Sequence, residues 1–140
     1  MDTALLDVLD AKARGYRPLV DFATWRVAVL GFDDDLRPDQ IHTMERHSET
    51  DEVFFLAAGQ AVLILGGNQA EPNGVHPVVM DSGKVYNIRR GTWHGIVLTE
   101  DASVLLVENL DTGSRNTEVA NLTPDCRQKI RDVADRGLGG

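Results

Sequence analysis

The chain has 140 residues, of which 42% are hydrophobic, so it has the usual length of a single domain and can bury one core. Its 22 acidic residues outnumber its 14 basic ones, and the net charge of −8 argues against a nucleic-acid partner, because an acidic surface repels phosphate backbones. No apolar run could span a bilayer, the first residues lack a signal-peptide pattern, and the single cysteine cannot form an internal disulfide, so we expect one cytoplasmic domain over residues 1–140 with no membrane partner.

The N-terminal segment is predicted to be a short helix over residues 3–14. Thr3 is a possible N-cap, and the pattern ends near Gly15. The apolar residues that recur at helical spacing are Leu5, Leu6, Leu9 and Ala13.

The middle of the chain is typical of short strands. Residues 18–30 change to a strand-like period, and residues 31–38 form an acidic turn. Short strands at regular spacing, separated by glycine turns, predict an all-β barrel or sandwich rather than βαβ units, with a barrel core over residues 18–110. The further strands are expected over residues 52–56, 60–65, 75–80, 84–89, 95–98 and 103–108.

A second helix is predicted over residues 124–136, packed on the outside of the barrel. Thr123 suits the N-cap, Pro124 the first helical position, and Gly137 the end of the helix. Cys126 shares an apolar face with Ile130 and Val133, so we interpret it as a small buried apolar group rather than a nucleophile.

Two histidine-bearing blocks flank the strand-rich stretch. The first block contains Glu45, His47, Glu52 and Gly59, and the second contains Gly83, Arg89, Gly91, His94 and Leu98. This spacing resembles the two motifs of the cupin superfamily, which implies a double-stranded β-helix, or jelly-roll, barrel. The chain departs from the superfamily pattern at three positions: Glu45 stands where a histidine is usual, Arg89 replaces proline, and Leu98 replaces asparagine.

The candidate site follows from the same blocks. Residues two apart on a strand point to one face, so Glu45 and His47 project together and can meet Glu52 and His94 inside the barrel. Imidazole and carboxylate groups suit a divalent transition metal such as Zn, Fe, Mn, Ni or Co. Glu45 is then a fourth ligand or a free catalytic base. The alternative is a metal-free polar interior in which the carboxylates pair with Arg46 or Arg89.

Three residues near the second block are candidates for substrate binding: Tyr86, Arg89 and Trp93. An inward arginine could clamp a carboxylate through its bidentate fork, although Arg89 is equally consistent with a solvated turn. Trp93 either lines the pocket mouth or points to the other face of its strand.

Two histidines lie outside the motif spacing. We interpret His42 as a surface residue at a strand end and His76 as a loop residue.

The predicted function is a small metal-dependent enzyme acting on a polar carboxylate or hydroxy-acid metabolite. The segments 44–47 and 85–94 are also similar to blocks of ureidoglycolate lyases, which implies a lyase. Oxygenase or isomerase chemistry is the alternative within the class of metal-dependent enzymes. A non-catalytic metabolite-binding protein and a metal-free structural protein are the alternatives. Small barrels often cover an edge strand by dimerising, so we expect a homodimer through residues 18–30.

Overall fold

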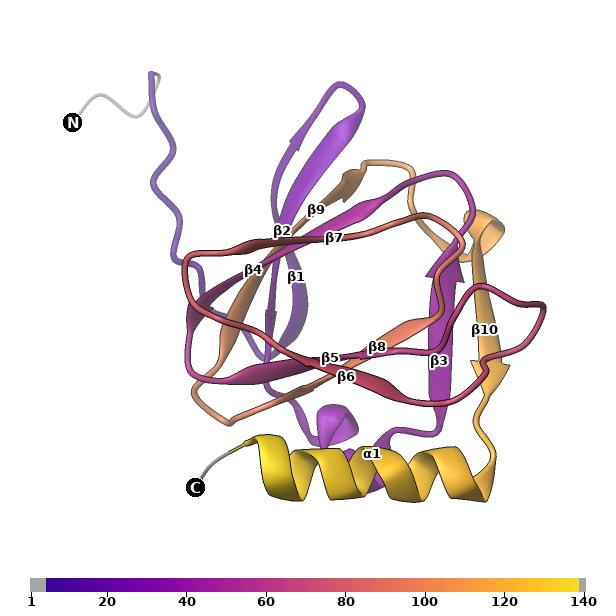
Figure 1. Ribbon diagram of the computed structural model, residues 1–140. Helices are drawn as coiled ribbons and strands as arrows, with labels where there is room; N and C mark the ends of the chain where they lie inside the picture. The colour runs from indigo at the N-terminus through magenta and orange to yellow at the C-terminus, as the bar shows by residue number, and fades with distance from the viewer. Residues whose placement is uncertain (1–4, 139–140) are drawn as a thin grey trace.

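The computed structural model describes residues 5–138 and consists of two five-stranded antiparallel sheets that face each other (Figure 1). The strand order is β1-β2-β9-β4-β7 in one sheet and β10-β3-β8-β5-β6 in the other. This arrangement confirms the predicted all-β jelly-roll. The strands are β1 (Gly15–Phe22), β2 (Trp25–Gly31), β3 (Thr43–His47), β4 (Glu52–Ala58), β5 (Ala61–Leu65), β6 (His76–Val79), β7 (Val85–Ile88), β8 (His94–Leu98), β9 (Ser103–Asn109) and β10 (Thr117–Asn121).

The C-terminal helix α1 (Pro124–Gly137) lies beneath the β5–β8 side of the barrel (Figure 1). Its start agrees with the prediction, because the Thr123 hydroxyl accepts a hydrogen bond from the Cys126 backbone N–H at 3.1 Å. Short 3-10 turns span Asp34–Leu36, Pro38–Gln40 and Ser114–Asn116. Within residues 5–138, no helix is long and apolar enough to cross a membrane.

The prediction of an N-terminal helix over residues 3–14 is wrong for the residues that the structure describes. Residues 5–14 contain no helix, while residues 3 and 4 lie outside the described range. Leu5 is 84% exposed, and Leu6 and Leu9 are also exposed. A helix of this length is marginal in water unless its apolar face packs against something. Helical spacing of the leucines alone was therefore insufficient to predict a helix in this segment.

Two further boundaries differ from the predictions. His76, predicted to lie in a loop, begins β6, where it pairs with Leu65 of β5. The strand β10 was not predicted, and it extends the barrel beyond residue 110 by pairing antiparallel with β3. Its sequence, Thr-Glu-Val-Ala-Asn, alternates only weakly, so its strand conformation depends on the backbone hydrogen bonds that β3 offers.

Apolar side chains form two separate cores on the two sides of the β10-β3-β8-β5-β6 sheet. The barrel interior contains Ala28, Phe54, Leu56, Ala61, Leu63, Met80, Ile88, Ile96, Leu98, Ala102, Val104 and Leu106. The space between the sheet and α1 contains Met44, Val62, Ile64, Trp93, Val97, Leu122, Cys126, Ile130 and Ala134. The alternation of neighbours such as Val62 and Leu63 between the two cores follows from the two-residue period of a strand. Cys126 is buried, as predicted.

Candidate metal centre

Four side chains from three strands meet in the barrel interior. Glu45 and His47 come from β3, Glu52 from the start of β4, and His94 from the start of β8. Glu45 lies directly opposite His94 in the β3–β8 register, so both side chains point to the same face. The two motif blocks are joined by a hydrogen bond from the Gly91 N–H to the His47 carbonyl at 2.7 Å.

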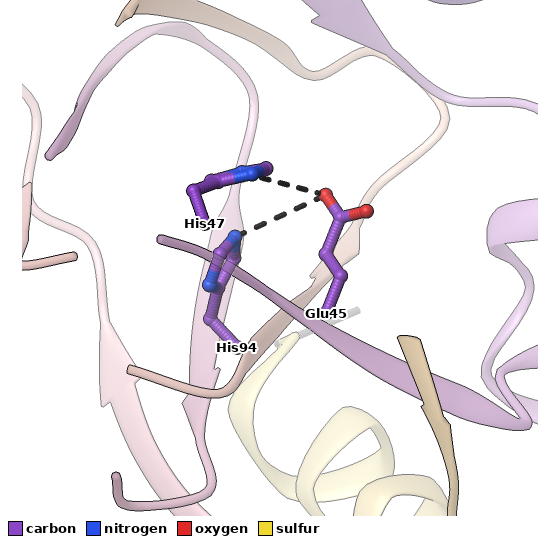
Figure 2. Close-up of side chains that lie close together, drawn as sticks. All are labelled: Glu45, His47 and His94. Atoms are coloured by element: carbon purple, nitrogen blue, oxygen red, sulfur yellow. Dashed lines mark ion pairs between the residues drawn. The ribbon is translucent and has the colours of Figure 1, made fainter. Parts of the chain in front are cut away.

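The nitrogen Nε2 of each histidine faces the carboxylates. His47 Nε2 lies 3.1 Å from Glu52 Oε1, and His94 Nε2 lies 3.2 Å from the same oxygen. Glu45 Oε1 is farther away, at 3.8 Å from His47 Nε2 and 4.0 Å from His94 Nε2 (Figure 2). The imidazole ring centroids are 5.2 Å apart. The structure thus brings together all four residues that the sequence predicted as metal ligands.

The outer nitrogens of both rings are held by neighbouring groups. His94 Nδ1 is 2.9 Å from the Thr92 carbonyl oxygen, which can only accept, so Nδ1 carries the proton. In the neutral ring, Nε2 then presents a lone pair to the site. His47 Nδ1 is 2.9 Å from the Thr117 hydroxyl of β10. Such outer contacts orient histidines that bind metals and select their tautomer.

Glu52 and His47 shift each other's pKa. Burial acts to raise the pKa of Glu52, but the hydrogen bond from His47 and the nearby His94 outweigh it and lower that pKa well below its ordinary value. Burial also acts to lower the pKa of His47, but the hydrogen bond to Glu52 and the surrounding carboxylates raise it overall. Glu52 is therefore a carboxylate that stays charged inside the barrel.

A fifth polar residue of the site, Glu108 on β9, was not predicted. It is buried, its Oε1 accepts the Tyr16 hydroxyl at 2.6 Å, and it groups with His47 and Glu52. Burial and the charge of Glu52 raise the pKa of Glu108 to about 7, against the lowering effect of the Tyr16 hydrogen bond. One feature of the sequence could have revealed Glu108 as a site residue. It lies two residues after Leu106 and four after Val104 on the same strand, so it faces inward at a position where an apolar residue is expected.

A cavity of about 680 Å³ adjoins these side chains. Phe54, Ile96 and Leu106 form its apolar wall, and β10 contributes Thr117 and Val119. Its polar lining outside the central cluster consists of Tyr16, Arg26, Asp35, Gln40, His42, Thr43, Thr112 and Ser114. A pocket of this size, with an apolar wall and a cluster of polar side chains, is suited to a small polar metabolite.

The three predicted substrate-binding residues do not line this cavity. Arg89 is exposed in the β7–β8 turn, and the Tyr86 hydroxyl accepts a hydrogen bond from the Asp81 N–H. Trp93 is fully buried on the opposite side of its sheet, where its indole N–H donates to the Gln69 carbonyl at 2.8 Å. Since Trp93 precedes His94, the two must face opposite ways once His94 points inward. Of the two orientations left open for Trp93, the structure shows the outward one.

The cation of the cavity wall is Arg26 rather than Arg89. Arg26 lies on β2 and pairs with Asp21 at 2.7 Å and 3.0 Å. His42 is exposed, as predicted, but it also lies on the cavity rim. Sequence patterns did not reveal that Arg26 and His42 line the cavity. Their positions depend on how β2 and the segment before β3 pack against the rest of the barrel.

The residues present suit a divalent metal ion. Glu45, His47 and His94 offer ligand atoms within 4.8 Å of one another, and so do His47, Glu52 and Glu108. His94 Nε2 is buried without a hydrogen-bond partner although it lies 3.2 Å from Glu52 Oε1. A buried lone pair facing carboxylate oxygens lacks a favourable partner unless a proton or a cation lies between them. Imidazole nitrogens and carboxylate oxygens are ligands of Zn, Fe and Mn.

No family model matches this sequence, and no curated protein is significantly similar to it. Solved structures do share its fold. One is a cupin-2 domain containing protein from Shewanella frigidimarina NCIMB 400, with 15% identity, a TM-score of 0.50, and 76% of this chain and 87% of that chain covered.

Two enzymes are similar in structure. The TDP-fucose-3,4-ketoisomerase WlaRA from Campylobacter jejuni shows 14% identity and a TM-score of 0.53, over 69% of this chain and 68% of that chain. The nucleoside dehydratase Pac13 shows 9% identity and a TM-score of 0.52, over 76% of each chain. At these identities the likeness concerns the fold, and together with the sheet order it shows that the chain has the cupin fold.

Proposed function

We propose that this protein is a divalent-metal-dependent enzyme that acts on a small polar carboxylate or hydroxy acid. The observation that supports the metal is the convergence of two buried imidazole Nε2 atoms on the Glu52 carboxylate. An enzymatic role is supported by the fold, because cupin-fold neighbours include a ketoisomerase and a dehydratase.

His47, His94 and Glu52 would hold the ion, and Glu45 would be a fourth ligand or a base. A bound divalent ion supplies Lewis acidity toward a substrate oxygen. Glu45 is suited to proton transfer because its side chain is 49% exposed and therefore accessible from the cavity, whereas Glu52 is enclosed. Phe54 and Leu106 form an apolar wall on one side of the cavity.

Arg26 provides positive charge for an anionic substrate. Its guanidinium lies in the cavity wall, where Asp21 fixes its orientation by two hydrogen bonds. Asp21 occupies the Nε and Nη2 donors of Arg26, and Nη1 faces the Tyr16 hydroxyl, so Arg26 would attract an anionic substrate by its charge rather than through a free fork. A lyase acting on ureidoglycolate is the finer proposal, supported by the resemblance of residues 44–47 and 85–94 to ureidoglycolate lyases.

The first experiment measures metal content and turnover together. The purified protein is loaded separately with Mn²⁺, Fe²⁺, Co²⁺, Ni²⁺ and Zn²⁺, and the bound metal is counted by elemental analysis after desalting. We expect one ion per chain in the wild type and none in His94→Ala. The matched control is His76→Ala, which removes an exposed histidine of β6 and should bind one ion.

Turnover is then followed by NMR with ureidoglycolate and a panel of small hydroxy acids. Consumption of a substrate by the loaded wild type, lost in His94→Ala, supports the enzyme. Tight binding of a metabolite without turnover supports a binding protein instead. Stoichiometric metal in His94→Ala contradicts the proposed centre.

We also propose that the chain forms a homodimer through the edge strand β1. In the described residues β1 pairs only with β2, and the hairpin they form projects beyond the barrel (Figure 1). Its tip exposes Phe22 and Trp25, whose rings lie 5.9 Å apart. An open edge with exposed aromatic residues is a common site of self-association. A monomer in light scattering at high concentration would contradict this proposal.

A further inference from the structure

We propose that Glu108 of β9, which lies outside both sequence blocks, is a ligand of the ion and binds it together with His47 and Glu52. This inference rests on the proposed metal site and extends it. The three residues offer ligand atoms within 4.8 Å of one another, and all three are buried.

The charge balance of this group calls for a cation. Two carboxyl groups, from Glu52 and Glu108, lie close together in the interior beside the His47 imidazole. Neighbouring carboxylates in a buried site destabilise each other when both are charged. A divalent ion between them would satisfy both oxygens and the imidazole nitrogen at once.

A chain of hydrogen bonds that begins at Tyr16, which also lines the cavity, holds Glu108 in place. Its Oε1 accepts the Tyr16 hydroxyl at 2.6 Å, and Arg26 donates to the Tyr16 oxygen at 3.4 Å while it pairs with Asp21. Contacts of this kind orient ligating carboxylates in metal sites. Because the Tyr16 hydroxyl donates to the Glu108 carboxylate and fixes its orientation, we assign Tyr16 as a positioning residue.

Glu108 and Glu45 differ in their exposure and in how firmly they are held, as expected for a metal ligand and a catalytic base. Glu45 is half exposed and is 3.8 Å or more from both imidazole nitrogens, whereas Glu108 is buried with a fixed partner. His47 belongs to both groups of candidate ligands, and a single imidazole nitrogen binds only one ion. An ion held by His47, Glu52 and Glu108 stays next to His94, because His94 Nε2 lies 3.2 Å from Glu52 Oε1. Glu45, which is farther from both imidazole nitrogens, is then left free to move a proton.

The test is titration of the metal-free protein with Zn²⁺ by calorimetry, followed by Co²⁺ binding monitored through visible absorption. We expect Glu108→Gln to weaken Zn²⁺ binding by at least about ten-fold and to change the Co²⁺ spectrum, because an inner ligand is replaced. Tyr16→Phe should weaken binding less and keep the Co²⁺ spectrum. The control Glu118→Gln alters an exposed carboxylate on β10 and should behave as the wild type.

Each outcome decides between the two proposals. If the wild type binds no metal, both the proposed function and this inference fail. If the wild type binds metal and Glu108→Gln keeps the same affinity and spectrum, only the inference fails. Circular dichroism checks that each variant is folded, and Glu108→Asp, which retains the charge but shortens the side chain, replaces Glu108→Gln if the latter does not fold.

Discussion

The two faces of β3 and β8 use neighbouring residues for opposite purposes. On the inner face, Glu45, His47 and His94 form a polar site beside a cavity. On the outer face, Met44 and Trp93 lie in the apolar core between the sheet and α1. The sheet therefore separates a region that must stay polar and accessible from one that supplies packing energy. A single residue step along the strand decides which role a side chain has.

The largest effect is expected on the outer face, from Trp93→Ala. Trp93 is fully buried, and the Arg46 guanidinium lies over its ring at 4.5 Å. Truncating a buried tryptophan typically lowers the free energy of unfolding by about 3–5 kcal/mol. Urea unfolding measures this loss, with Val85→Ala, which truncates an exposed apolar side chain of β7, as control. Folded Trp93→Ala should still bind metal, and a loss below about 1 kcal/mol would contradict the separation of the two faces.

On the inner face, the largest effect comes from the ion itself. A ligand that binds only the folded state stabilises it by about 2.7 kcal/mol at a free concentration of 100 Kd. Thermal unfolding with and without added metal should therefore show a clear rise in Tm for the wild type. The same addition should leave Tm of His94→Ala unchanged, and an equal rise in both proteins would indicate metal binding elsewhere.

Glu45→Gln tests the difference between a ligand and a base within the inner face. Because Glu45 is half exposed and distant from both imidazole nitrogens, we expect Zn²⁺ affinity to fall by less than about ten-fold, while turnover is lost. Glu52→Gln, measured beside it by calorimetry, should lose far more affinity. If the two variants weaken metal binding equally, Glu45 is a ligand.

Asp51→Ala should have the smallest effect, since it acts on the loop that positions the site. The Asp51 carboxylate accepts hydrogen bonds from the Arg90 N–H at 2.8 Å and from Asn87 at 3.1 Å, and thereby links the start of β4 to the turn before β8. We expect a small fall in Tm and little change in metal affinity, with Glu71→Ala, in an exposed loop, as control.

The effect of Asp51 should depend on pH in a defined direction. The Arg90 N–H, and then Asn87, lower the pKa of Asp51 below its ordinary value. The stabilisation of the folded state by Asp51 is thus fully present at pH values above the ordinary pKa of aspartate. It is lost as the pH falls through the lowered pKa of the folded state. The Tm difference between wild type and Asp51→Ala should shrink on acidification. A difference that grows at low pH would contradict this role.

The sequence by itself determined the barrel, the C-terminal helix and the four candidate ligands. Strand alternation, glycine turns and the N-cap at Thr123 are local signals, and they act the same way wherever the segment packs. The spacing of Glu45, His47, Glu52 and His94 was informative because residues two apart on a strand share a face and because the two blocks resemble the cupin motifs. The N-terminal leucines gave a misleading helical pattern, since a helix also needs a surface to cover.

Only the tertiary structure decided which polar residues surround the ligands. Glu108 and Tyr16 are 92 residues apart and meet because β1, β2 and β9 are neighbours in one sheet. The same sheet order places Arg26 in the cavity wall, while the inward orientation of His94 turns Trp93 outward. Contacts between distant segments depend on strand order and register, and no local pattern in the sequence encodes that pairing.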